Sequence, residues 1–391
     1  MTKRESTPEY TFIIPVYNGE PFLVDNIRSL QRQTYPHFEA IYVNDGSEDG
    51  SERILRRESA SDPRIRWYSK PNGGIASAIA YGLERASGDH ILLLDQDDVA
   101  QPDRLERTAQ AFREGAELIM GAYEIVDEHL NPTGKIITLP DHVGPDNILL
   151  EQLKRSYILG SALAFRYKHD FAFHPASGGA TDYDIALKMM LNGYRFAYID
   201  EVLIRYRVHR RNTSANYRNQ QRDMRRVFEQ YEPERLAAKL EERGFGKGEI
   251  CSALGILYLF LDDLPPAEEW LMRAERLLSP AQGRIYDEFC FYFGVLKVKR
   301  GDIDGSIREF GELMKRVRNP SVFNNYGCLL VRKGEVRSAE RWFRRALAAN
   351  PEYLDARHNL DLCEKNVTDR DQYRFTARLL RDQLTHTSII H

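Results

Sequence analysis

Three carboxylates occupy four positions of the sequence directly after an apolar run. In the stretch LLLDQDD, residues 92–98, Asp95, Asp97 and Asp98 follow three leucines. Carboxylates so close together repel one another unless protons or a cation neutralise them. A divalent cation with a phosphorylated substrate would do this. Alternatively, Asp97 or Asp98 caps the helix that PDRLERTAQAF begins, with Pro102 in its first turn, but capping does not need three acids.

The elements that position these acids follow from the pattern of the first half of the chain. From Tyr10 to about Arg207, short apolar and β-branched runs alternate with helical patterns, which indicates βαβ units on a mostly parallel sheet. The run HILLLD is typical of a fully buried parallel strand, and open α/β sheets bind ligands at the carboxyl ends of their strands. The other predicted elements are the strands YTFIIPV, FEAIYVN and RIRWYS and the helices 24–33 and 75–86.

Two common nucleotide-binding motifs are missing from the sequence. The first predicted strand is followed by PVYNGEPFLVDN, which lacks the glycine-rich turn of a dinucleotide-binding fold. No Walker loop is present either, which argues against the common nucleoside triphosphatases. What remains is a nucleotide bound without a glycine cradle, with its diphosphate held by a metal ion.

The second half of the chain is helical and repeats itself. The segment FNNYGCLLVRKGEVRSAERWFRRALAANPEY resembles a tetratricopeptide repeat of about 34 residues. The matching positions are Phe323, Tyr326, Gly327, Leu330, Gly334, Ala339, Phe343, Ala346 and Pro351, then Gly294, Gly301, Ser306 and Phe310 upstream, and more loosely Leu254, Gly255, Tyr258, Ala267, Leu271 and Ala274. Stacked helix pairs form a concave groove that suits a peptide or a protein partner. We expect Asn324 and Asn325 to face this groove.

Composition and charge set wider limits. The chain has 391 residues, 42% of them hydrophobic and 29% charged, with a formal net charge of −3. These values are typical of a globular protein with two domains and give no bulk reason to bind nucleic acid. The N-terminus lacks a signal-peptide pattern and no apolar stretch approaches about 18 residues, so we expect a cytoplasmic protein with at most peripheral membrane contact. The four cysteines lack metal-site spacing and are predicted to be buried.

Four motifs in order give residues 10–215 a specific resemblance. They are FIIPVYNGEPFLVDNIRSLQRQTYPHFEAIYVNDGSEDGS, then NGGIASAIAYGLERASGDHILLLDQDD with PDRLE, then TDYDIALKMMLNGY and YRVHRRNTS. Together they resemble the family 2 glycosyltransferases of GT-A fold. The resemblance implies a domain over residues 1–215, followed by a helical linker at 216–245 and the repeats at 246–391. It also implies transfer of a sugar, with inversion, from a nucleoside diphosphate sugar, with UDP-sugars favoured by family tendency.

The resemblance also implies roles for individual residues. Pro15 and Tyr17 would wall the base, where an aromatic ring can stack. Asp45 would accept a hydrogen bond from the base, although an aspartate before Gly46 is also common in turns. Asp95 would face the ribose and Asp97 would bind Mn²⁺ or Mg²⁺, which bridges the phosphates. The nucleotide-binding positions carried over are Pro15, Tyr17, Asp45, Asn72, Asp95 and Arg207.

Two later motifs supply the predicted base and a closing segment. Asp182, in ATDYD, matches the general base, with Asp184 as its competitor and a helix cap as the structural alternative. His209 and Arg207, in RYRVHRRN, match a segment that closes over the diphosphate, with His209 as a second metal ligand. Alternatively, this is a solvated basic loop, or the arginine-rich stretch 205–226 contacts an anionic lipid surface.

Two departures from the family pattern concern the donor and the acceptor. Ile79 and Ala80 stand where relatives commonly carry an Arg-Asn pair. The stretch 157–175 follows no pattern that identifies an acceptor. The leading hypothesis is a glycosyltransferase whose repeats select a protein or glycan acceptor, bind a protein partner or self-associate. The alternative is a non-catalytic scaffold with a relic first domain.

Overall fold

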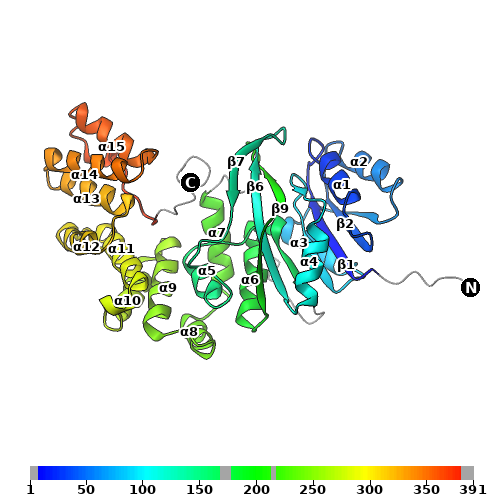
Figure 1. Cartoon of the computed structure of the whole chain (residues 1–391), viewed down its shortest axis with the longest axis horizontal. Helices are drawn as coiled ribbons and strands as arrows, with labels where there is room; N and C mark the ends of the chain where they lie inside the picture. Colours follow the sequence, from blue (N-terminus) through cyan, green and yellow to red (C-terminus); the bar gives the residue numbers. More distant parts are fainter. Residues whose placement is uncertain (1–7, 168–177, 213–216, 380–391) are drawn as a thin grey trace, which may run out of the picture. The chain divides into compact units, whose positions relative to one another are not determined.

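The chain folds into two compact units, residues 1–232 and 233–391, in a computed structural model. The structure describes residues 8–167, 178–212 and 217–379. Figure 1 shows strands and helices in the first unit and helices in the second. The unit boundary falls inside the stretch 216–245 that the sequence predicts as a linker, and each unit is described by itself below.

The first unit is built on one mixed sheet. Its order in the described residues is β3-β2-β1-β4-β8-β6-β9-β5, with β7 paired to β6. The strands are β1 (Tyr10–Val16), β2 (Phe38–Asp45), β3 (Ile65–Lys70), β4 (His90–Leu93), β5 (Val99–Ala100), β6 (Leu118–Val126), β7 (Pro132–Ile137), β8 (Ala164–Arg166) and β9 (Phe196–Arg207).

The prediction of a mostly parallel sheet holds for one half of it. Strands β1 to β4 pair in parallel, as βαβ units require. Beyond β4, the strand β8 pairs antiparallel with both β4 and β6, whereas β6 and β9 run parallel and β5 and β7 are antiparallel edges. The prediction is therefore wrong for the second half, where the sheet is mixed.

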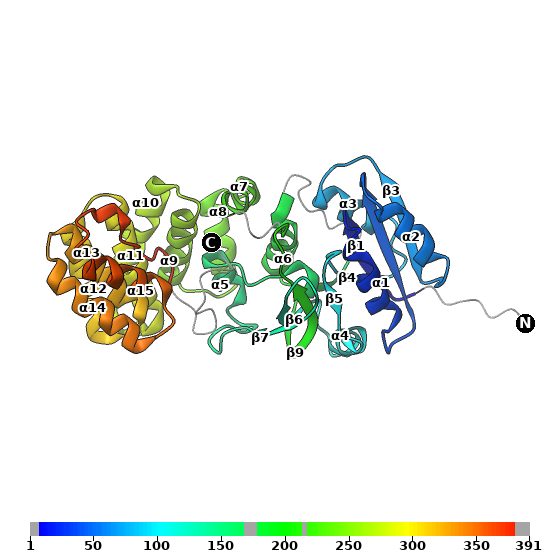
Figure 2. The same ribbon diagram turned by 90° about the horizontal axis from the view of Figure 1, so that it is seen from above.

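Helices cover the parallel half of the sheet because its central strands are almost entirely buried, whereas the edge strand β3 is partly exposed. Every residue of β2 is buried, which demands cover on both faces. Helix α3 approaches closely through Gly82, where a Cβ would lie 2.7 Å from Ile13 Cγ2. The helices of this unit are α1 (Leu23–Gln31), α2 (Ser51–Ser59), α3 (Ile75–Leu83), α4 (Arg104–Arg113), α5 (Ile148–Lys154), α6 (Thr181–Leu191) and α7 (Tyr217–Phe228). Figure 2 shows α1, α2 and α3 beside β1 and β3.

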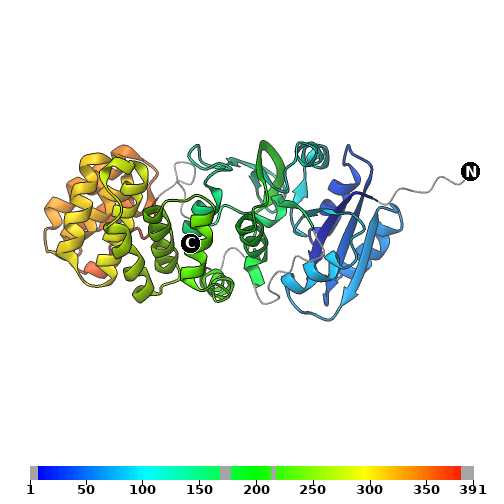
Figure 3. The same ribbon diagram turned by 90° about the horizontal axis from the view of Figure 1, so that it is seen from below.

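The second unit stacks helix pairs in sequence order (Figure 3). Its helices are α8 (Pro233–Glu242), α9 (Lys247–Phe260), α10 (Leu264–Glu275), α11 (Arg284–Lys299), α12 (Ile303–Arg316), α13 (Pro320–Arg332), α14 (Val336–Ala349) and α15 (Leu354–Glu364). The four cysteines are buried and unpaired, as predicted.

One packing geometry recurs in three of these pairs. A Cβ on Gly255 would lie 2.5 Å from Leu271, one on Gly294 would lie 2.6 Å from Phe310, and one on Gly327 would lie 2.6 Å from Phe343. In each pair the glycine of the first helix receives a large side chain of the second, always the same number of residues later. The repeat predicted from sequence is thus present in the packing, while its assignment to the tetratricopeptide family stays a prediction.

No helix within the described ranges is long and apolar enough to cross a membrane.

Candidate active site

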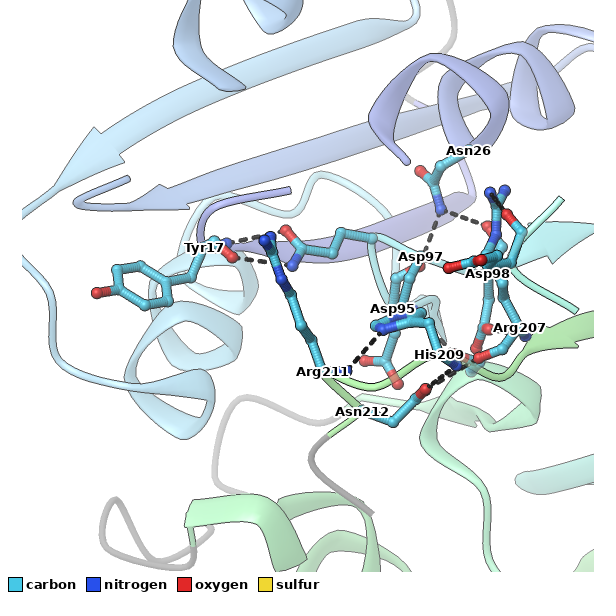
Figure 4. A network of polar contacts seen from close by, with 12 residues as sticks. Tyr17, Asn26, Asp95, Asp97, Asp98, Arg207, His209, Arg211 and Asn212 are labelled. Carbon is cyan, nitrogen blue, oxygen red and sulfur yellow. Dashed lines mark hydrogen bonds and ion pairs between the residues drawn. The ribbon is translucent and has the colours of Figure 1, made fainter. Parts of the chain in front are cut away.

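The acidic loop after β4 is held in shape by neutral side chains. The Asn26 side-chain amide, on α1, donates to the backbone carbonyls of Asp95 at 2.9 Å and Asp98 at 2.8 Å. Tyr42, on β2, fixes this amide by donating to its oxygen at 2.8 Å. The Asp95 N–H donates to Ser161 Oγ at 2.9 Å. The loop can therefore present its carboxylates without using them to hold its own backbone (Figure 4).

The three acids differ in what surrounds them. Asp98 is fully buried and accepts the Arg207 N–H at 2.9 Å. Burial and the charges of Asp97 and Asp95 raise its pKa, and the hydrogen bond from Arg207 opposes this rise. Burial and the same kind of repulsion, from Asp97 and then Asp182, raise the pKa of Asp95 to about 7. Burial and mutual repulsion thus favour the protonated forms of these two carboxyl groups.

A buried arginine lies beneath the acids. Arg104, at the start of α4, is fully buried and donates to the Leu93 carbonyl at 2.8 Å. Burial lowers its pKa to about 9, opposed by the charges of Asp98 and Asp95. Sequence reasoning missed this residue because an arginine on an amphipathic helix is normally solvated. It supplies positive charge to the acidic loop from the side of the core.

The two predicted metal ligands meet. His209 Nε2 lies 2.8 Å from Asp97 Oδ2. The imidazole stacks on Phe22, with ring centroids 4.4 Å apart, and its Nδ1 accepts the Arg211 N–H at 3.1 Å. Within residues 8–167, 178–212 and 217–379, no three His, Cys, Asp or Glu side chains are grouped to hold a metal ion by themselves. An oxygen and a nitrogen ligand side by side suit a divalent cation that takes its other ligands from phosphates and water.

The two acids of ATDYD have different environments. Asp182 is the second residue of α6 and lies beside Gly160, on which a Cβ would lie 3.3 Å from Asp182 Oδ2. Burial raises the Asp182 pKa to about 6, against the lowering effect of backbone hydrogen bonds. The charge of Asp182 in turn raises the pKa of Asp95. Asp184 is fully buried and pairs with Lys188 at 3.1 Å. The structure therefore puts Asp182 near the acidic loop and gives Asp184 a contact within its own helix.

Asp45 is engaged by the turn that contains Asn72. At the end of β2, its carboxylate lies 2.5 Å from Lys70 Nζ and accepts the N–H groups of Gly73 at 3.0 Å and Gly74 at 2.7 Å. The Asp45 carboxylate is therefore not free in solvent, and its partners lie on another strand and turn rather than in the turn at Gly46. The Asn72 side chain is exposed at the tip of the same turn. Lys70 was not predicted, because its partner lies on a different strand.

Tyr17, of the predicted base wall, and Arg211, of the basic loop, are both exposed near the acids. Tyr17 keeps 49% of its surface exposed, and the Gln96 side chain clasps its backbone N–H and carbonyl, both at 2.9 Å. Pro15, in β1, is half-buried. Arg211 is exposed, and its side chain extends from the His209 loop toward Tyr17 (Figure 4). The sequence did not single out Arg211 from its neighbours.

The Arg207 side chain already has partners within the chain. Only 2% of it is exposed, and its guanidinium contacts Asp25 at 3.1 Å and the Glu128 carbonyl at 3.1 Å. Its predicted contact with a diphosphate stays a prediction that would require release of these partners.

Other arginines of the stretch 205–226 also pair within the chain, such as Arg205 with Glu124 at 3.1 Å. Residues 213–216 of that stretch, and residues 168–175 of the acceptor stretch 157–175, lie outside the described residues.

Comparison with known proteins shows which family the sequence of the first unit is similar to. Residues 11–174 match the model of glycosyl transferase family 2. An uncharacterized glycosyltransferase of Rickettsia conorii is 34% identical over 237 residues, which are 56% of this chain and 38% of that protein. The chondroitin synthase of Pasteurella multocida is 29% identical over 215 residues, 53% of this chain and 21% of that protein.

A crystal structure of S. aureus TarS, residues 1–349, matches with a TM-score of 0.50 at 17% identity, covering 76% of this chain and 89% of that one, which shows the fold alone. The chain spans 38%, 36% and 30% of the lengths of three Rickettsia relatives. Residues 11–174 therefore carry a glycosyl transferase family 2 domain on a GT-A-like mixed sheet.

Proposed function

We propose that the chain is an inverting, metal-dependent glycosyltransferase that moves a sugar from a nucleoside diphosphate sugar, with UDP-sugars favoured, to an acceptor hydroxyl. The observation that carries the proposal is the 2.8 Å approach of Asp97 and His209, beside Asp95, whose pKa responds to the Asp182 carboxylate. The family 2 match and the relatives named as glycosyltransferases support the reaction class.

Asp97 and His209 would hold Mn²⁺ or Mg²⁺. When bound there, such an ion would supply Lewis-acid stabilisation of the charge on the departing nucleoside diphosphate. Arg211 is better placed than Arg207 to contact the diphosphate, because its side chain is exposed and reaches toward Tyr17, whereas Arg207 is buried. The Asn26 amide holds the backbone of the acidic loop, and Arg104, which donates to the Leu93 carbonyl at the end of β4, supplies positive charge beneath it.

Asp182 would act as the general base. Its carboxylate takes the proton of the acceptor hydroxyl as that oxygen bonds to the anomeric carbon. The bond from this carbon to the phosphate oxygen breaks on the opposite side, and its electron pair leaves with the nucleotide, so the configuration inverts. Burial raises the pKa of Asp182 to about 6, which makes it a stronger base than an ordinary aspartate. Proton transfer still runs late, because an alcohol is a far weaker acid.

The nucleotide would lie between Tyr17 and the turn at Asn72. The exposed Tyr17 ring can stack on the base and Asp95 would face the ribose. Asp45 receives Lys70 and two backbone N–H groups, which leaves about one of its four lone-pair sites for the base. Lys70 thereby fixes the carboxylate that would read the base.

Two acceptor classes remain for the proposed transfer: a protein or peptide, and a growing polysaccharide. A relative named chondroitin synthase supports a glycan acceptor. The helical pairs of the second unit would select the acceptor or a protein partner, or mediate self-association, with no part in the chemistry.

Thermal unfolding with UDP, GDP and dTDP, each with and without Mn²⁺, tests the proposal. One nucleotide should raise the melting temperature, and more so with the metal, because a ligand that binds the native state stabilises it. A chain that responds to none of the three, in either condition, would instead be the non-catalytic scaffold.

A further inference from the structure

The chain's own C-terminal segment, Tyr373–Arg378, runs across the helix pairs of the second unit. Tyr373 stacks against Phe343 of α14, with ring centroids 6.1 Å apart. Phe375 meets Phe310 of α12 edge to face at 6.0 Å. The Arg378 guanidinium lies 4.0 Å from the ring centroid of Phe260, on α9. The segment thus follows the stack backward from its last pair to its first.

Three asparagines hold the backbone of this segment. Asn359 accepts the Arg374 N–H at 2.7 Å and donates to the Arg374 carbonyl at 2.9 Å. Asn325 accepts the Thr376 N–H and donates to the Thr376 carbonyl, both at 2.8 Å. Asn324 adds a second donor to the Arg374 carbonyl at 2.9 Å. These three side chains, the asparagine clamp, are 0% exposed.

The clamp reads main chain rather than side chains. It takes both the N–H and the carbonyl of every second residue, as a neighbouring strand does when a peptide is added to a sheet edge. Such recognition fixes an extended conformation and leaves the sequence of the segment free. The groove is therefore built to hold an extended peptide.

Selectivity comes from two kinds of side-chain contact. The Thr376 hydroxyl is buried, donates to Asp355 at 3.1 Å and hydrogen-bonds the Tyr353 hydroxyl. Aromatic rings at positions 373 and 375 pack on aromatic residues of the helix pairs. The pattern is an aromatic residue, any residue, a second aromatic residue and then a hydroxyl.

Departure of the segment would remove its hydrogen bonds to the clamp and uncover the three amides, of which Asn359 also donates to Asn324 at 2.8 Å. Water would replace the lost hydrogen bonds, but the aromatic contacts of the segment would be lost as well. Exchange of one extended segment for another keeps both kinds of contact. Exchange is therefore favoured over an empty groove.

We propose that this groove is a peptide-binding site, occupied in cis by residues 373–378, and that its external ligand is an extended protein segment with the pattern aromatic, any residue, aromatic, Ser or Thr. The proposal stands on the second unit alone and is independent of the glycosyl transfer proposed above.

The test uses the full chain with a specific protease site inserted between Thr368 and Asp369, in an exposed loop. The chain folds intact and is then cleaved. The probe is a fluorescent peptide of residues 370–379, RDQYRFTARL, with binding followed by anisotropy. We expect no binding before cleavage and saturable one-to-one binding after it. A probe with Thr376→Val should bind at least about tenfold more weakly, since it removes the buried hydrogen bonds of the hydroxyl to Asp355 and Tyr353.

Variants of the chain separate recognition from folding. Asn325→Ala should lower the affinity for the probe by at least about tenfold after cleavage. The control Asn192→Ala, at an exposed position of the first unit, should leave that affinity unchanged. A cleaved chain that loses its helical circular dichroism, or keeps its own segment and never takes up excess probe, would overturn the proposal. So would an uncleaved chain that is a dimer exchanging segments between copies, because the ligand would then be a second copy.

Discussion

The assignment of Asp182 as base makes a quantitative prediction about pH. The base must be ionised to work, and burial raises its pKa to about 6. At pH 5 about one tenth of the carboxyl is ionised, so the rate should be about tenfold lower than at pH 8. An ordinary aspartate would be almost fully ionised at both values, and the profile would be flat over this range.

The assay is release of UDP from a panel of UDP-sugars with Mn²⁺, with water as the acceptor, between pH 5 and 8.5. Stabilisation by UDP is measured at each pH, so that loss of nucleotide binding is not mistaken for loss of the base. Asp182→Asn should bind nucleotide normally and lose about 10²–10⁴-fold in rate. Asp184→Asn is the control, because its partner is Lys188 and its effect should fall on stability. A dead Asp184→Asn beside an active Asp182→Asn, or a pH-independent rate, would refute the assignment.

Three further substitutions test the other parts of the structure. Asp97→Asn should abolish the Mn²⁺-dependent part of nucleotide stabilisation and turnover while the melting temperature without ligand stays close to the parent's; manganese-dependent turnover at the parent's rate would contradict its role. Arg104→Met removes a buried cation beneath the acids and should lower the free energy of unfolding in urea by about 3 kcal/mol; an unchanged midpoint would show that it does not stabilise them. Gly327→Ala should destabilise by about 1–3 kcal/mol because its Cβ would meet Phe343 at 2.6 Å, whereas Gly311→Ala, 3.8 Å from its nearest neighbour, should not; equal effects would refute the close-packing argument.

The central strands of the parallel half were predictable because they are buried almost throughout. The runs predicted at 10–16 and 38–44 correspond to β1 (Tyr10–Val16) and β2 (Phe38–Asp45). Continuous apolar runs between helices carry this signal in the sequence itself. The antiparallel strand β8 has three residues, too few for a pattern, and its pairing with β4 and β6 depends on contacts far apart in the chain.

The site was predictable in its acids and less so in their partners. The crowding of Asp95, Asp97 and Asp98 is visible in the sequence. The contact of Asp97 with His209, 112 residues later, was expected only from family resemblance. Arg104 and Lys70 were missed because lysine and arginine are normally exposed, and only the folded chain shows which carboxylates surround them.

The asparagine clamp shows a different limit. Asn324 and Asn325 were expected to face a groove and to meet a partner. They are buried, and their partners are backbone atoms of Arg374 and Thr376. Every residue has the same backbone groups, so such contacts leave no trace in sequence composition or spacing.

The C-terminal segment changes how the second unit should lose its structure. In a linear stack each helix pair touches its neighbours alone, so the ends can melt before the middle. Here one extended strand touches Phe260, Phe310 and Phe343, on three successive pairs. Loosening any pair therefore disturbs contacts at the others, and the stack should unfold in a single cooperative transition. Release of the segment would divide that transition into several smaller ones. The same helices would therefore unfold differently on heating with the segment bound and with it released.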